Sequence, residues 1–222
     1  TVEGTANHAQ NLDMTAGAGN ITLTQAVRST KRLGDVTINN VQNLLASSTF
    51  AAKSVTQTTG TGTTTFSGID TTGANDTAGG AVNIVTAGAI DTSAGTITAK
   101  GGTATAGIGR AGGAVTLNST GSTVTVGAID TTGSNAVTGA GGAGGAVSLT
   151  GTGASAITLK GAITAKGGTG TTTTGNGGNV SLNSATTLNA ALITINAIKG
   201  DGTAGGTVRF YNTLEGTSAF GD

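Results

Sequence analysis

The stretch Gly112-Gly-Ala-Val-Thr-Leu117 decides the fold, because close copies of it recur along most of the chain. The copies are Gly79-Gly-Ala-Val-Asn-Ile84, Gly144-Gly-Ala-Val-Ser-Leu149, Gly177-Gly-Asn-Val-Ser-Leu182 and Gly205-Gly-Thr-Val-Arg-Phe210. Their valines follow one another at steps of 33, 32, 33 and 28 residues. Such a fixed period is the signature of a repeat architecture.

Within each period, apolar and polar residues alternate, as in Val115-Thr-Leu117 and Val124-Thr-Val126. This alternation places the aliphatic side chains on one face of a β-strand and the hydroxyl-bearing side chains on the other. Each period holds three such short strands. We therefore predict an all-β fold, a right-handed parallel β-helix (β-solenoid) with about seven to eight coils of three short strands.

In such a solenoid, equivalent apolar residues of successive coils stack on one another and form the core. The predicted core residues are Val82, Ile84, Val115, Leu117, Val147, Leu149, Val180, Leu182 and Val208. Glycine at the corners permits positive φ and close backbone approach. The longest irregular stretches, 101–111, 131–143 and 167–176, fall at one place in the period, so we expect them to protrude from one corner as low-charge loops.

Composition excludes several classes of function. The 222 residues include 41 Gly, no Pro and no Cys, with 10 Lys and Arg against 10 Asp and Glu. Without clustered positive charge we expect no nucleic-acid partner and no anionic lipid surface. The lack of Cys rules out disulfides and thiolate metal sites. No apolar run approaches the ~18 residues that span a membrane, so we expect no membrane insertion.

The length suits one domain, and we predict a single β-solenoid over residues 1–222. It divides into degenerate N-terminal coils over 1–66, regular repeats over 67–210 and a C-terminal end segment over 211–222. Because the chain begins with Thr1, we expect a processed product or a segment of a longer chain.

The repeats resemble those of filamentous-haemagglutinin-type giant bacterial surface adhesins, which are β-solenoid exoproteins. The resemblance is carried by the repeated Gly-Gly-x-Val-x-Leu motif, by Ile129-Asp-Thr-Thr-Gly133 and by the upstream segments Ala16–Leu23 and Leu33–Ile38. It implies export, residence at the cell surface and a structural or adhesive role. Relatives with a two-partner secretion domain usually carry Asn-Pro motifs there. This chain has no Pro, which places it outside such a domain.

Acidic and basic coils alternate at one corner of the repeat. Asp70 and Asp130 both lie in Ile-Asp-Thr-Thr-Gly, whereas the coils between and after them carry Lys100 and Lys166 in Ile-Thr-Ala-Lys-Gly-Gly. Like charges stacked ~5 Å apart repel, and opposite charges attract mildly. We therefore hypothesise a charge ladder of Asp70, Lys100, Asp130 and Lys166. The alternative is four independent, solvated charges.

No residues combine into a recognisable catalytic, metal or cofactor site. Some parallel β-helices cleave acidic polysaccharides, but such enzymes need carboxylates clustered in a groove, and here the acids are scattered. Gly141–Ala146 has the glycines of a calcium-binding solenoid turn without its aspartates. Gly107–Gly112 matches Gly-x-Gly-x-x-Gly but leads into a strand instead of a helix. We predict no catalytic residue, no metal and no cofactor.

The open backbone edges of a stacked-coil rod invite pairing with another chain unless they are capped. Neither end of this sequence shows a clear cap. We expect end-to-end self-association into a homopolymer, or continuation of the rod in a longer chain. The predicted function is therefore that of a non-enzymatic, extracellular structural rod of a bacterial surface. The alternative is an adhesin module that binds a host receptor, cell surface or glycan through its corner loops.

Overall fold

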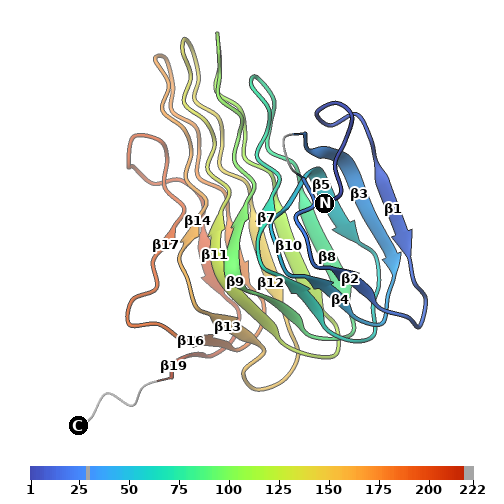
Figure 1. Ribbon diagram of the computed structural model, residues 1–222. Helices are drawn as coiled ribbons and strands as arrows, with labels where there is room; N and C mark the ends of the chain where they lie inside the picture. Colours follow the sequence, from blue (N-terminus) through green and yellow to red (C-terminus); the bar gives the residue numbers. More distant parts are fainter. Residues whose placement is uncertain (29–30, 218–222) are drawn as a thin grey trace.

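The computed structural model describes residues 1–28 and 31–217, and over these residues the protein is all β, with no helix (Figure 1). The strands wind round a common axis and pair in parallel into a sheet that nearly closes on itself. The predicted all-β, parallel solenoid-like architecture is confirmed. Residues 218–222 of the predicted end segment lie outside the described residues.

The strands form three ladders that run along the axis. Each member of ladder 1 pairs in parallel with the next. Its members are β1 (Leu12–Thr15), β3 (Leu33–Asn40), β5 (Phe50–Gln57), β8 (Val82–Thr86), β10 (Val115–Ser119), β12 (Val147–Thr150), β15 (Val180–Leu182) and β18 (Val208–Phe210).

Ladder 2 is built in the same way from the second strand of each coil. Its members are β2 (Ile21–Leu23), β4 (Leu44–Ala46), β6 (Thr64–Phe66), the first part of β9 (Ile90–Thr98), the first part of β11 (Val124–Asp130), β13 (Ile157–Leu159), β16 (Thr186–Leu188) and β19 (Leu214–Gly216).

Ladder 3 completes the coil. Its members are the first residues of β5, β7 (Ile69–Asp70), the last parts of β9 and β11, β14 (Ile163–Thr164) and β17 (Ile195–Asn196). Bridges from Val2 to Val27 and from Val27 to Phe50 extend it toward the N-terminus. β9 and β11 each serve two ladders, and the register of their pairing shifts between Val126 and Ala128, across Gly127.

The core lies inside the three ladders. Val82, Val115, Val147 and Val180 pair in sequence along ladder 1. Two residues further on, a second column follows the same pairings. It holds Ile84, Leu117, Leu149 and Leu182. All eight side chains are at most 1% exposed. Full burial of one such side chain contributes about 1.5–3 kcal/mol, so these columns are a main source of stability.

Val208 departs from the prediction that it belongs to the core. It pairs with Val180 and continues the valine column, yet it is 37% exposed. The physical reason is its position, because β18 is the last strand of ladder 1 within the described residues and nothing there covers its outer edge.

Glycine pairs recur because two backbones approach each other at that point. A Cβ on Gly145 would lie 2.0 Å from the carbonyl oxygen of Gly113, and a Cβ on Gly113 would lie 2.0 Å from that of Gly80. The N–H of Gly145 also donates to the Thr131 carbonyl of the same coil at 2.8 Å, which closes the coil. Positive φ, the other role expected for glycine, occurs at none of the described Gly-Gly pairs of the repeat.

The loops between ladder 3 and ladder 1 project from one corner and stack side by side (Figure 1). Backbone hydrogen bonds join neighbouring loops. Gly109 N–H donates to the Ala140 carbonyl at 2.8 Å, and Gly141 N–H donates to the Thr173 carbonyl at 2.9 Å. The loops therefore form a regular flap, in which each loop is held by the next.

Candidate functional site

The corner between ladder 3 and the flap carries two ion pairs, Arg32–Asp70 and Lys100–Asp130. Here the chain leaves each strand through a turn closed by an acidic side chain. Asp70 Oδ1 accepts from the N–H of Thr72 at 2.9 Å, and Asp130 Oδ1 accepts from the N–H of Thr132 at 3.0 Å. Asp and Asn favour such local bonds to the backbone two residues on. The two aspartates therefore shape the corner as well as carrying charge.

The structure brings only part of the hypothesised charge ladder together. Lys100 Nζ lies 2.9 Å from Asp130 Oδ2. Asp70 instead pairs with Arg32, and Lys166 has no ion-pair partner among the described residues. The register explains this result, because Asp70 and Asp130 both align with Thr98, and Lys100 lies two residues beyond Thr98. The lysines are thus not stacked directly on the aspartates.

The Lys100–Asp130 pair affects the titration of its carboxylate. Burial raises the pKa of Asp130, but hydrogen bonds from Thr132 and Lys100 and the charge of Lys100 outweigh it, so the net pKa is lowered. Asp130 is therefore ionised at neutral pH. Because Lys100 is nearly half exposed, solvent screening keeps the net contribution of this pair small.

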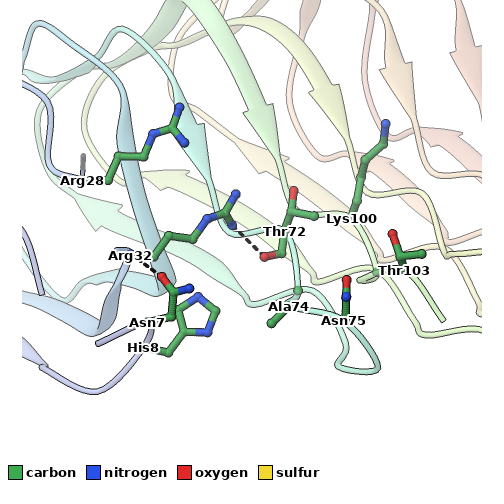
Figure 2. Close-up of a pocket in the computed structure, with 11 residues that line it drawn as sticks. Asn7, His8, Arg28, Arg32, Thr72, Ala74, Asn75, Lys100 and Thr103 are labelled. Carbon is green, nitrogen blue, oxygen red and sulfur yellow. Dashed lines mark hydrogen bonds between the residues drawn. The ribbon is translucent and has the colours of Figure 1, made fainter. Parts of the chain in front are cut away.

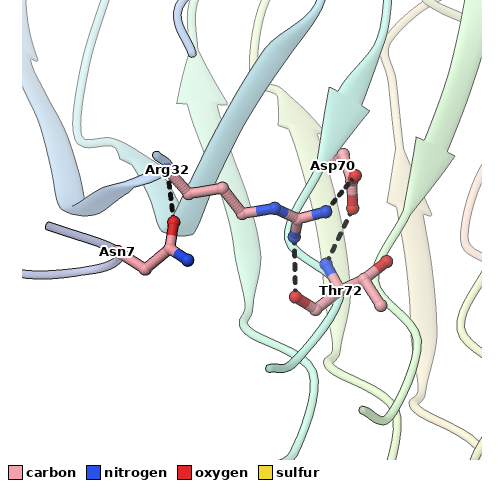
Figure 3. Close-up of polar contacts among 4 residues, drawn as sticks. All are labelled: Asn7, Arg32, Asp70 and Thr72. Carbon is pink, nitrogen blue, oxygen red and sulfur yellow. Dashed lines mark hydrogen bonds and ion pairs between the residues drawn. The ribbon is translucent and has the colours of Figure 1, made fainter. Parts of the chain in front are cut away.

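Arg32 joins the N-terminal coils to the corner (Figure 3). Its guanidinium donates to the Thr72 carbonyl at 2.7 Å and pairs with Asp70, while its backbone N–H donates to Asn7 Oδ1 at 3.0 Å. Arg32 thus connects three segments that are distant in the sequence. The fork of donors in a guanidinium suits this bridging role better than a lysine ammonium would.

A pocket of about 400 Å³ opens beside Arg32 (Figure 2). Its size falls in the range of small-ligand sites. The lining residues are Asn7, His8, Arg28, Arg32, Thr72, Gly73, Ala74, Asn75, Lys100, Gly101 and Thr103. No Asp or Glu is among them, whereas three of them, Arg28, Arg32 and Lys100, carry basic side chains. Two of these three are ion-paired, Arg32 with Asp70 and Lys100 with Asp130, so the net positive charge of the lining comes mainly from Arg28.

Two groups of the pocket lack protein partners within the described residues. The guanidinium of Arg28 forms no hydrogen bond or ion pair there, and the buried His8 Nε2 has no hydrogen-bond partner. Burial lowers the pKa of His8, and the charges of Arg32 and Lys53 lower it further against a smaller opposing effect of Asp35. His8 is thus neutral at pH 7. The arrangement can hold an anionic group by charge and hydrogen bonding.

Sequence reasoning missed this pocket, because its residues come from four segments that are distant in the sequence: Asn7 and His8, Arg28 and Arg32, 72–75, and 100–103. One signal was present. Arg28, Lys31 and Arg32 are three of the chain's 10 Lys and Arg, and they lie within five positions. Only the fold shows that two of them meet Lys100.

A second candidate site is the exposed edge of the last coil. Val208 and Phe210 of β18 are 37% and 38% exposed, and Leu214 of β19 is 47% exposed. Their partners one coil earlier, Val180, Leu182 and Thr186, are all buried. These three residues are thus core residues that lack a covering strand in the described part of the chain.

Over residues 1–28 and 31–217, no group of three or more His, Cys, Asp or Glu is placed to hold a metal ion. A search of the same residues finds no helix with the length and apolarity needed to cross a bilayer. Comparisons with protein-family models, curated proteins and solved structures give no match to this chain.

Proposed function

We propose that the chain is a non-enzymatic structural module, a stiff β-solenoid rod at the surface of a bacterium. Three features support the proposal: one cluster of mostly aliphatic side chains fills the inside of the ladders, neighbouring flap loops are hydrogen-bonded to each other, and the repeats resemble those of exported surface proteins. The finer geometry, a single right-handed domain of about seven to eight three-stranded coils, belongs to the same proposal.

The rod builds a filament by stacking end to end. The observation that carries this proposal is the exposure of Val208, Phe210 and Leu214 at the last coil, because each continues a ladder whose earlier members are covered. An uncovered strand edge is a template for pairing with another chain. Stacking buries this edge and its apolar side chains in one step.

Sedimentation velocity and electron microscopy over a range of protein concentrations test this function. We expect wild-type protein to form rods of increasing length, and Phe210→Asp with Leu214→Asp to remain monomeric. Leu192→Asp is the matched control, because Leu192 is 80% exposed but belongs to none of the strands. A wild-type protein that stays monomeric at every concentration contradicts the proposal.

The corner pocket favours a second candidate, an adhesin module that binds an acidic saccharide. The ligand class follows from the guanidinium of Arg28, which has no protein partner within the described residues, and from the lack of lining carboxylates. Isothermal titration with a uronic-acid oligosaccharide and a neutral one of equal length tests it. We expect binding of the acidic sugar only, weakened at least about fivefold by Arg28→Ala and unchanged by Lys160→Ala outside the pocket. Equal affinity for both sugars, or none for either, contradicts this candidate.

A further inference from the structure

The first and last strands of ladder 1 carry opposite charges at the same register position. β1 reads Leu12-Asp13-Met14, and β18 reads Val208-Arg209-Phe210. The pairings place Leu12 and Val208 in the valine column, and Met14 and Phe210 in the column two residues further on. Asp13 and Arg209 therefore occupy the same outward-facing position at opposite ends of one ladder.

We propose that two copies of this chain join head to tail in one register, with β18 and β19 of one copy pairing in parallel with β1 and β2 of the next. This inference rests on the proposed function and specifies the junction. Val208 then lies beside Leu12 of the next copy, and Phe210 beside Met14. On ladder 2, Leu214 lies beside Ile21 of the next copy.

The side chains at this junction fit one another in size as well as in apolarity. Phe210 is the largest residue of its column, and it meets Met14, whose unbranched side chain adapts to irregular neighbours. On ladder 2, Gly216 lies beside Leu23 of the next copy, so a small residue faces a large one. Leu12, Met14, Ile21 and Leu23 are all only partly buried within their own copy.

Charge selects the register. In the proposed pairing, Arg209 lies next to Asp13 of the following copy at the spacing of paired strands, ~4.8 Å between backbones. Opposite charges on neighbouring strands attract, whereas the same charges at both ends would repel. A slip of one residue would move Arg209 to the inner face and expose Val208 and Phe210, because side chains alternate between the two faces. Both charged side chains are exposed; within the described residues, Asp13 accepts a hydrogen bond from the Asn39 side-chain amide and Arg209 donates one to the Tyr211 hydroxyl at 3.2 Å.

The third ladder is compatible with this junction. At the N-terminal end it begins one coil before the other two, since Val2 pairs with Val27. At the other end, within the described residues, it stops at β17, one coil before β18 and β19. In the proposed junction, Val2 of the next copy therefore lies in the same coil as β18 and β19. It is the next member of ladder 3 after Ile195 of β17.

Cysteine cross-linking tests the register directly, because the natural chain has no Cys. Cα atoms of disulfide partners lie 4.4–6.8 Å apart, a range that includes the spacing of paired strands. We expect Asp13→Cys with Arg209→Cys to give a ladder of covalent multimers under mild oxidation. Thr22→Cys with Arg209→Cys is the matched control, because Thr22 is exposed at the same end but lies on ladder 2. It should give no ladder.

Charge exchange provides the second measurement. Asp13→Arg and Arg209→Asp should each weaken assembly by at least about tenfold in critical concentration, and mixing the two variants should restore it. Wild-type protein can assemble while the Asp13→Cys, Arg209→Cys pair fails to cross-link and the charge variants behave like wild type. That result would contradict the proposed register but not the formation of filaments. If wild-type protein stays monomeric, both the filament and the register are contradicted.

Discussion

At the scale of single residues, the amide side chain of Gln57 interrupts an apolar column of ladder 1. Gln57 lies between Ile38 and Ile84 in ladder 1 and is fully buried. It is tolerated because Thr64 on ladder 2 is both donor and acceptor to its amide, at 2.9 and 3.0 Å. A buried polar group costs little only while its partners remain. The pair also links two ladders through the core.

Removal of one partner should therefore cost more than removal of both. We expect Thr64→Val to lower the free energy of unfolding by about 1–3 kcal/mol, since the Gln57 amide oxygen loses its donor and its nitrogen keeps only the longer bond to the Thr59 carbonyl, at 3.3 Å. Gln57→Leu with Thr64→Val should recover most of that loss. Urea denaturation of the two single variants and the double variant measures the coupling. Additive effects of the two changes would show that the pair does not act as a unit.

The corner ion pair should make stability depend on pH in the acid range. Since the pKa of Asp130 is lowered in the folded state, its contribution is present above the ordinary value of about 3.9 and is lost as pH falls through the folded pKa. Lys100→Met should reduce this acid-range dependence, with an effect below about 1 kcal/mol. Lys166→Met, at the lysine two repeats further on that has no ion-pair partner among the described residues, is the control. Unfolding curves between pH 2 and 7 measure how the stability of each variant depends on pH. The same pH dependence in both variants would contradict a stabilising role of the Lys100–Asp130 pair.

At the scale of elements, the repeat is set by how closely neighbouring coils approach. The glycine pairs lie where the backbone of one coil meets the carbonyl groups of the coil before it. Aliphatic columns hold the inner face of the strands, and the glycine pairs allow the corner to close. The two constraints act on neighbouring positions, which is why Gly-Gly and Val-x-Leu recur together.

Substitution at the second glycine of a pair should be more harmful than at a glycine with free space. We expect Gly145→Ala to lower the free energy of unfolding by at least about 1–3 kcal/mol, because its Cβ would overlap the Gly113 carbonyl. Gly68→Ala is the matched control, since the nearest atom to its Cβ would be 3.6 Å away. Thermal unfolding of the two variants measures the difference. Similar melting temperatures would argue against close coil contact at Gly145.

Parts of this structure follow from sequence pattern and others do not. The valine and leucine columns are predictable, because burial imposes one residue type at one position in every coil. The pairing of Lys100 with Asp130 instead of Asp70 is not, because it depends on a two-residue offset and on Arg32 from a distant segment. The pocket escapes prediction for the same reason, since loop geometry alone brings His8 to Lys100.

At the scale of the whole molecule, the ladders give the rod one repeated contact along its length. Every coil buries the face of the coil before it, so stability is close to a sum of neighbouring contacts. The last described coil presents the same kind of face without a neighbour, through Val208, Phe210 and Leu214. A second copy that pairs in register with this coil buries that face, as each coil within the molecule buries the face of its neighbour.

Cryo-electron microscopy of the assembled protein tests this continuity most directly. We predict filaments in which strands lie across the axis at a regular rise of ~4.8 Å. The rise should continue unbroken through the junction between copies, with density for β18 beside β1. Particles of a single copy, or filaments whose strands lie along the axis or whose spacing breaks at each junction, would contradict the account.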